Sequence, residues 1–228
     1  AHAIASMIDR NGKILVEGWR STQIPNSVRA AIAKLDVGEG ENTPDINPNW
    51  GEPDLTIAER VFASNTFEVR AFETGNPKSP ANAIPPSAVV FGHLRYVVGT
   101  DISKLMPLLR AHLDKHGFND ITITSERDMM PATRLDPDHP WAKWAIKSLS
   151  KTAEDEIAVI PNLGGALPND VFADLLGLPT IWVPHSYAGC SQHAPNEHIL
   201  ESISKSALRL MTGLWWDLGE GNTPRQVT

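Results

Sequence analysis

The segment from Ala88 to Thr124 constrains the fold more than any other part of this sequence. The run Ala88–Val98 is rich in β-branched and aromatic residues and predicts a strand. Asp101 is a favourable N-cap, apolar residues follow it at helical spacing, and Gly117 supplies a C-cap. A second β-branched run, Ile121–Thr124, predicts another strand. This order of elements predicts a small sheet covered by helices on one face.

Periodicity and turn residues predict further elements on both sides of this unit. The predicted helices are His2–Asp9, Asn26–Leu35, Leu55–Phe62, Trp141–Thr152, Asn169–Leu176 and Pro195–Leu218. The predicted strands are Ile14–Trp19, Thr66–Phe72 and a buried Thr180–Val183. The segment Arg127–Pro140 contains three prolines and changes in composition, so we expect one domain over residues 1–126 and a second over 127–228.

The charge of the chain argues against nucleic acid as its main partner. The net charge is −7. Six acidic residues lie within 36–54, a predicted surface loop without Lys or Arg, and they account for most of this charge. No stretch approaches the ~18 apolar residues of a membrane-spanning helix, so no membrane partner is expected. The single cysteine, Cys190, excludes an internal disulfide framework and fits a cytoplasmic location.

His193 is the candidate metal ligand. It lies in Ser191-Gln192-His193-Ala194-Pro195-Asn196-Glu197, between a predicted strand and a predicted helix start, where α/β folds place ligand sites. A helix dipole at that point would favour the neutral imidazole that a metal requires. A loop histidine that only makes hydrogen bonds is the plainer alternative. A self-contained zinc site built from His185, Cys190, His193 and His198 is another, although this spacing matches no familiar zinc motif.

Two weaker patterns could bind substrate. Arg95 lies near the end of a predicted strand, where a guanidinium can hold a carboxylate, and Asn82 upstream can add an amide contact. The alternative for Arg95 is a surface ion pair. The loop Gly164-Gly165-Ala166 follows the apolar run Ile157–Ile160, and paired glycines let the backbone approach a ligand closely. It is neither a P-loop nor a dinucleotide-binding motif.

Taken in order, these motifs resemble the M20 metallopeptidases, which include carnosinase-like dipeptidases, aminoacylases and related deacylases. The matching segments are Asn82-Ala83-Ile84-Pro85 with Arg95, Gly164-Gly165-Ala166-Leu167-Pro168 and His193-Ala194-Pro195-Asn196-Glu197. The resemblance runs from about Ala3 to Leu214, and its last motif is the most specific. Ala166 stands where the family usually has Ser or Thr. The long insertion from Ile24 to Ala81 is more typical of the larger dipeptidase-like members.

The resemblance implies a function and a fold class. It implies an α/β protein: an α+β lid domain with a small antiparallel sheet, lacking its first strand, followed by the C-terminal part of a zinc-peptidase catalytic domain. His193 would be the last ligand of a two-zinc centre. Asn82 and Arg95 would hold the carboxylate of a small peptide or N-acyl amino acid, and Gly164, Gly165 and Ala166 would line the pocket. The lid domain would form a homodimer.

Several residues that the family needs for catalysis are not located in this chain. The other zinc ligands and the general-base Glu of the family belong to an N-terminal half, and this chain begins without Met and without such a half. We therefore expect it to represent part of an amide hydrolase. Two alternatives stay open, a non-catalytic dimerisation or interaction module and a stand-alone protein with a single zinc.

Overall fold

The computed structural model describes residues 1–21, 23–35, 37, 46–125, 129–165 and 167–224. The chain forms two compact units. Unit 1 comprises Ala1–Gln23, Pro48–Thr56 and Ser64–Ala132, and unit 2 comprises Ile24–Asn47, Ile57–Ala63 and Thr133–Thr228. Residues 36 and 38–45 of the predicted acidic loop 36–54 lie outside the described residues. The assignment of residues 1–126 to a lid domain and 127–228 to a catalytic part stays a prediction.

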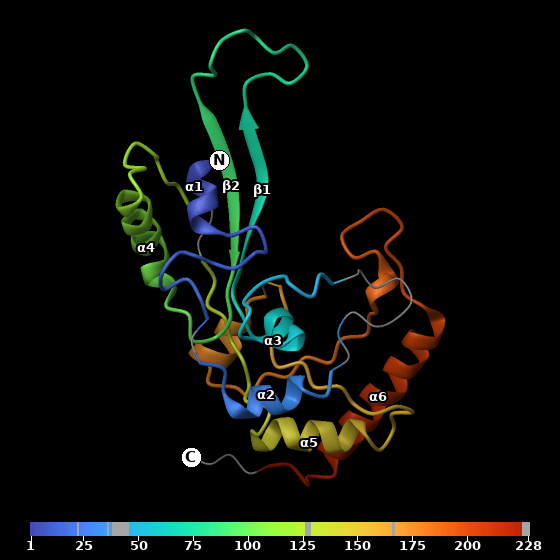
Figure 1. The fold of residues 1–228 in the computed structure, drawn as a ribbon. Helices are drawn as coiled ribbons and strands as arrows, with labels where there is room; N and C mark the ends of the chain where they lie inside the picture. Colours follow the sequence, from blue (N-terminus) through green and yellow to red (C-terminus); the bar gives the residue numbers. More distant parts are fainter. Residues whose placement is uncertain (22, 36, 38–45, 126–128, 166, 225–228) are drawn as a thin grey trace. The chain divides into compact units, whose positions relative to one another are not determined.

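Unit 1 is built on an antiparallel hairpin of β1 (Thr66–Thr74) and β2 (Ala88–Arg95) (Figure 1). Thr66 faces Arg95 at one end and Thr74 faces Ala88 at the other, with a bulge between Val69 and Ala71. The predicted small antiparallel sheet is therefore confirmed. Ile121–Thr124 is not a strand, and in the described residues the sheet has two strands.

Two helices pack on the base of this hairpin, α1 (His2–Met7) and α4 (Ile102–Lys115). The α4 boundaries follow the sequence, because Asp101 accepts a hydrogen bond from the Ser103 amide and Gly117 takes a left-handed φ of 79°. The buried core joins these elements to the segment after α1, and it contains Met7, Ile14, Val16, Trp19, Phe67, Leu105 and Leu113.

A buried asparagine ties the start of β1 to the end of the segment after β2. Asn65 is 3% exposed, and its side-chain amide donates to the Trp19 carbonyl at 2.9 Å and to Thr100 Oγ1 at 3.0 Å. Its Oδ1 accepts from the Val97 amide at 2.8 Å. Every polar atom of this side chain is satisfied, which burial of an amide requires. Asn65 therefore fixes the base of the hairpin against the core.

Unit 2 is helical in its described residues. Its elements are α2 (Asn26–Ile32), α3 (Ile57–Phe62), α5 (Pro140–Leu149), the π-helix η1 (Val171–Leu175), the 3-10 helix η2 (Ala188–Cys190) and α6 (Glu201–Gly219). An ion pair between Arg29 and Glu59 joins α2 to α3. The fully buried side chains Val28 and Ile32 make the inner face of α2.

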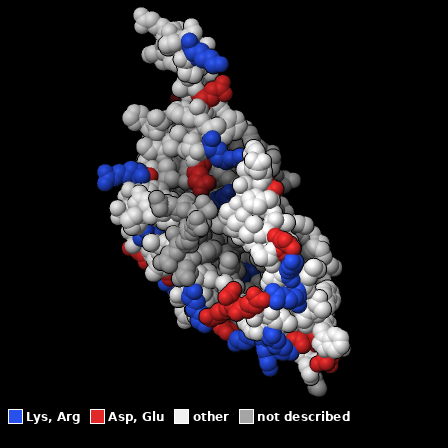
Figure 2. Space-filling model, turned by 90° about the vertical axis from the view of Figure 1, so that its right-hand side faces the viewer, with Lys and Arg blue, Asp and Glu red and all other residues white. Residues whose placement is uncertain are grey.

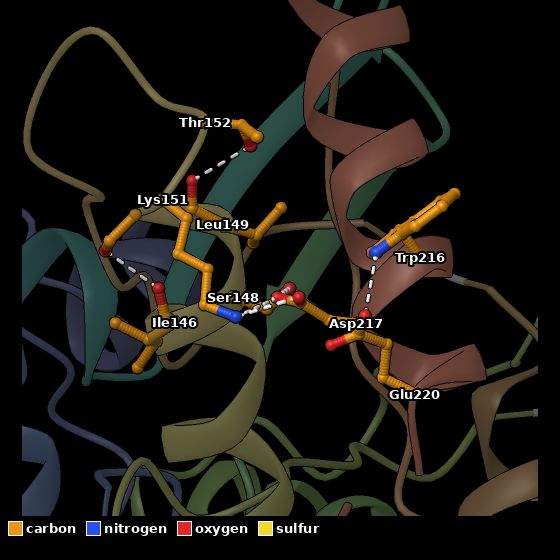
Figure 3. Close-up of polar contacts among 9 residues, drawn as sticks. Ile146, Ser148, Leu149, Lys151, Thr152, Trp216, Asp217 and Glu220 are labelled. Atoms are coloured by element: carbon orange, nitrogen blue, oxygen red, sulfur yellow. Dashed lines mark hydrogen bonds and ion pairs between the residues drawn. The ribbon is translucent and has the colours of Figure 1, made fainter. Parts of the chain in front are cut away.

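Helices α5 and α6 are joined by a polar network around Asp217 (Figure 3). Its carboxylate accepts from Ser148 Oγ at 2.7 Å and from Lys151 Nζ at 2.8 and 2.7 Å. The Lys151 hydrogen bond, followed by that from Ser148, lowers the pKa of Asp217 below its ordinary value. Gly213 allows the close approach here, because a Cβ at this position would lie 2.7 Å from Thr152 Cγ2.

Two other predicted strands do not form, and the terminal helix starts later than predicted. Ile14–Trp19 forms only one isolated bridge, between Ile8 and Ile14. Thr180–Val183 is neither a strand nor buried, since Ile181 and Trp182 are 39% and 56% exposed. The terminal helix begins at Glu201 rather than Pro195. Strand formation needs a partner as well as a β-branched run.

The surface carries both signs of charge. On the face drawn in Figure 2, Lys and Arg side chains are interspersed with Asp and Glu. No described helix is long and apolar enough to cross a membrane.

Candidate metal and substrate site

The loop that contains the candidate ligand His193 is braced by its own hydrogen bonds. It runs from Ser186 through η2 to His198. The His198 amide donates to the Cys190 carbonyl at 3.0 Å, which closes the loop, and the Ala194 amide donates to the Ser191 carbonyl at 2.9 Å. Buried Cys190 Sγ accepts from Ser186 Oγ at 3.2 Å. The chain path around His193 is therefore held by contacts within the loop.

The backbone of this loop is strained. Ser191, His193 and Asn196 have φ angles of 58°, 62° and 66°, and they are the only non-glycine residues with positive φ in the described chain. A side-chain-bearing residue in this region costs about 1–2 kcal/mol relative to the right-handed helical region. Such strain gathers at functional sites, where the surrounding structure holds it. Sequence patterns gave no indication of this feature beyond the abundance of polar residues.

The hydrogen bonds of His198 indicate which of its ring nitrogens carries a proton. Its Nδ1 lies 2.9 Å from the Asn196 carbonyl oxygen, which can only accept, so Nδ1 carries the proton. The Nε2 atom lies 2.6 Å from the Tyr187 hydroxyl oxygen and is hydrogen-bonded to it. Both nitrogens of His198 are thus occupied by protein groups. The alternative of a self-contained zinc site would require these bonds to break, and the sequence alone did not indicate the Tyr187–His198 pair.

His193 is placed differently. Its backbone amide donates to Glu197 Oε2 at 3.3 Å, which joins two residues of the recognised motif. The side chain is exposed, and within the described residues its imidazole has no hydrogen-bond partner. The dipole argument made from the sequence is wrong, because α6 begins eight residues after His193 and a helix dipole acts only within its first turn. His193 is therefore an accessible imidazole on a constrained loop.

The structure does not bring Asn82 and Arg95 together. Arg95 is the last residue of β2 and faces Thr66, whereas Asn82 lies in the loop at the opposite end of the hairpin. An eight-residue strand separates them by on the order of 20 Å. Both are exposed, and Arg95 has no ion pair with any acid in the described part of the chain. One substrate carboxylate cannot contact both residues of the same chain.

The glycine loop lies in unit 2. Gly164 and Gly165 are exposed, and a Cβ added at Gly165 would meet nothing within 4 Å. The backbone is therefore open to a ligand at this point. Ala166, the third predicted pocket residue, lies outside the described residues.

The described residues do not form a complete metal centre. No group of three or more His, Cys, Asp or Glu side chains among them is placed to hold a metal ion. In unit 1, an open hollow of about 550 Å³ is lined in part by His2, His112 and His116. These three histidines are not placed to hold a metal ion either. His193 by itself does not fit a two-metal site, which needs several ligands for each ion.

Comparison with solved structures places this geometry in a known fold. A M20 family metallo-carboxypeptidase from Sulfolobus solfataricus matches 93% of this chain with a TM-score of 0.72 and 25% sequence identity. A dipeptidase from Saccharomyces cerevisiae matches 93% with a TM-score of 0.66 and 18% identity, and human carnosine dipeptidase 1 matches 96% with 0.65 and 13%. Neither family sequence models nor curated proteins give a match.

The chain has the fold of the M20 peptidases. The resemblance seen in the motifs is thereby confirmed at the level of structure. The chain spans about half the length of these proteins, 50%, 46% and 48% respectively. Its neighbours are hydrolases, and those of the M20 metallopeptidase type imply a metal cofactor in general terms.

Proposed function

We propose that this chain is part of a metal-dependent hydrolase that cleaves amide bonds in small substrates with a free carboxylate. The observation that carries the proposal is the structural match to a M20 family metallo-carboxypeptidase over 93% of the chain. The constrained loop with an exposed His193 adds to it. The activity belongs to the gene product, by which we mean the whole polypeptide that the gene encodes around residues 1–228.

His193 would contribute one ligand to a zinc centre, and the remaining ligands and the general-base Glu would come from residues outside this chain. The bound metal would supply Lewis-acid activation of water and of the scissile carbonyl. The residues of this chain would position the substrate. The exposed backbone at Gly164 and Gly165 would line the pocket, and Arg95 would hold the carboxylate with its planar guanidinium.

The distance between Asn82 and Arg95 bears on whether this protein forms a homodimer. Because the two lie at opposite ends of the hairpin, one substrate would contact both residues only if they came from different subunits. This supports a homodimer formed through unit 1. The far part of the hairpin is suited to such a contact, since Phe72, Val89 and Phe91 are 48%, 48% and 42% exposed.

Replacing Arg95 with alanine tests the substrate class. In the gene product, we expect kcat/KM for an N-acyl amino acid to fall about 100-fold, mostly through KM, because a bidentate charged contact is lost. The same substrate with its carboxylate blocked as an amide should be hydrolysed poorly by both proteins and show little further loss. Arg70→Ala, in the neighbouring strand, is the matched control. If the unmodified gene product hydrolyses neither substrate, the proposed function is contradicted.

A further inference from the structure

Unit 2 contains a partly buried arginine, Arg134, that has no acidic partner. Among the described residues, no carboxylate oxygen lies within ion-pair distance of its guanidinium. The carboxylate of Asp136 instead accepts from Ser27 Oγ at 2.9 Å and from the Asp138 amide at 2.8 Å. Burial lowers the pKa of Arg134 below its ordinary value, and the charge of Asp136 opposes this only in part. Arginine keeps its charge at neutral pH, so a bound anion would stabilise it.

Asn162 holds the guanidinium of Arg134 in place. Arg134 Nη1 donates to Asn162 Oδ1 at 3.2 Å, and Asn162 Nδ2 donates to the Phe62 carbonyl at 2.5 Å. The Phe62 carbonyl can only accept, so the side chain of Asn162 must turn its oxygen toward Arg134. Within the described residues, this bond uses one of the five N–H donors of the guanidinium. The other donors can bind a ligand.

The glycine loop begins two residues after Asn162. Two residues of chain span at most about 7 Å, so Gly164 lies close to the side chain that holds Arg134. Gly164 and Gly165 are exposed, and in the described part of the chain neither backbone amide donates a hydrogen bond. A Cβ at Gly165 would meet nothing within 4 Å. Open backbone amides and a guanidinium are the kinds of donor that bind carboxylates.

We propose that Arg134 and the Gly164–Gly165 backbone form a binding site in unit 2 for the carboxylate of the substrate, with Asn162 as the positioning residue of the guanidinium. This inference rests on the proposed function, because it takes the ligand to be a small N-acyl amino acid or peptide. It adds a cation of unit 2 to Arg95 of unit 1. The sequence motifs did not single out Arg134 or Asn162, because their contact joins residues 28 positions apart.

Equilibrium binding of N-acetylmethionine tests this site in the gene product, which is freed of metal with a chelator so that binding is measured without hydrolysis. By calorimetry, Arg134→Met should raise the Kd at least about tenfold, because a bidentate charged contact is lost. Arg134→Lys keeps the charge with less disturbance of the fold and should raise the Kd about threefold. Arg209→Met is the matched control and should leave the Kd within about twofold, because Arg209 already pairs with Glu154 at 2.6 Å.

The amide of N-acetylmethionine lacks the carboxylate and so separates anion binding from general effects on the fold. It should bind the unmodified gene product at least about tenfold more weakly than the acid does. Asn162→Ala should raise the Kd of the acid about threefold, and neither Asn162→Ala nor Arg134→Met should change the Kd of the amide more than about twofold.

Three results would overturn the proposal. These are an unchanged Kd of the acid in Arg134→Met, equal binding of acid and amide by the unmodified gene product, and no binding of the acid. Hydrolysis measured on the metal-loaded gene product separates this proposal from the proposed function. Binding of the acid that depends on Arg134, without hydrolysis, contradicts only the latter.

Discussion

Replacing His193 with alanine in the gene product should lower both bound metal and hydrolysis, with kcat/KM falling about 100-fold or more. Metal sites of this class depend on a small number of protein ligands. The loss of one ligand therefore weakens the binding of the ion and alters its coordination geometry. His193 has an exposed imidazole without a hydrogen-bond partner in the described residues, and its backbone has a left-handed φ of 62°. Metal analysis together with a hydrolysis assay on the same sample measures the effect.

The same loop provides the controls for this variant. His185→Ala removes an imidazole outside the recognised motif and should leave metal content and turnover within about twofold of the unmodified gene product. Cys190→Ser tests the stand-alone zinc alternative, which requires the thiolate, whereas the two-zinc proposal predicts little change. Unaltered metal content and turnover in His193→Ala would contradict the assignment of His193. Loss of metal in Cys190→Ser would favour the alternative.

Replacing Trp19 with alanine should lower the free energy of unfolding of unit 1 by about 3–5 kcal/mol, the usual cost of removing a large buried aromatic side chain. Trp19 is 4% exposed and stacks obliquely on Phe67, with ring centroids 5.4 Å apart. Its Nε1 also donates to the Leu105 carbonyl at 2.9 Å. The variant therefore leaves a cavity and removes the link between the segment after α1 and helix α4.

Chemical denaturation of the 228-residue chain, followed by far-UV circular dichroism, measures this loss. Trp215→Ala is the matched control, because Trp215 is 65% exposed and its removal should change stability by less than about 1 kcal/mol. A Trp19→Ala chain that unfolds within 1 kcal/mol of the unmodified chain would show that Trp19 does not organise the core of unit 1.

The local sequence predicted those elements whose determinants lie within a few residues. The boundaries of α4 follow from Asp101 and Gly117, and the alternation in Thr66–Phe72 and Ala88–Val98 identified both strands of the hairpin. Ile121–Thr124 and Thr180–Val183 also have strand composition, yet neither pairs with another strand in the described residues. Because a strand exists only with its neighbour, composition could not decide these cases.

The order of the motifs predicts which residues belong to the candidate site, namely His193, Arg95 and the glycine loop, and these assignments stay predictions. The geometry of these residues could not be predicted from the motifs. The separation of Asn82 from Arg95 depends on the hairpin register, and the state of His198 depends on Tyr187 and on a carbonyl within the loop. These are contacts between groups whose positions are set by turns and left-handed residues. Periodicity and composition do not specify them.

Removal of metal from the gene product is the most direct test of the central claim that this chain belongs to a metal-dependent amide hydrolase. The rate of hydrolysis of an N-acyl amino acid is measured before treatment with a chelator, after metal analysis shows the ion to be gone, and after zinc is restored. The account predicts that the rate falls at least about tenfold and returns with zinc. A rate that is unchanged in the metal-free protein would contradict it.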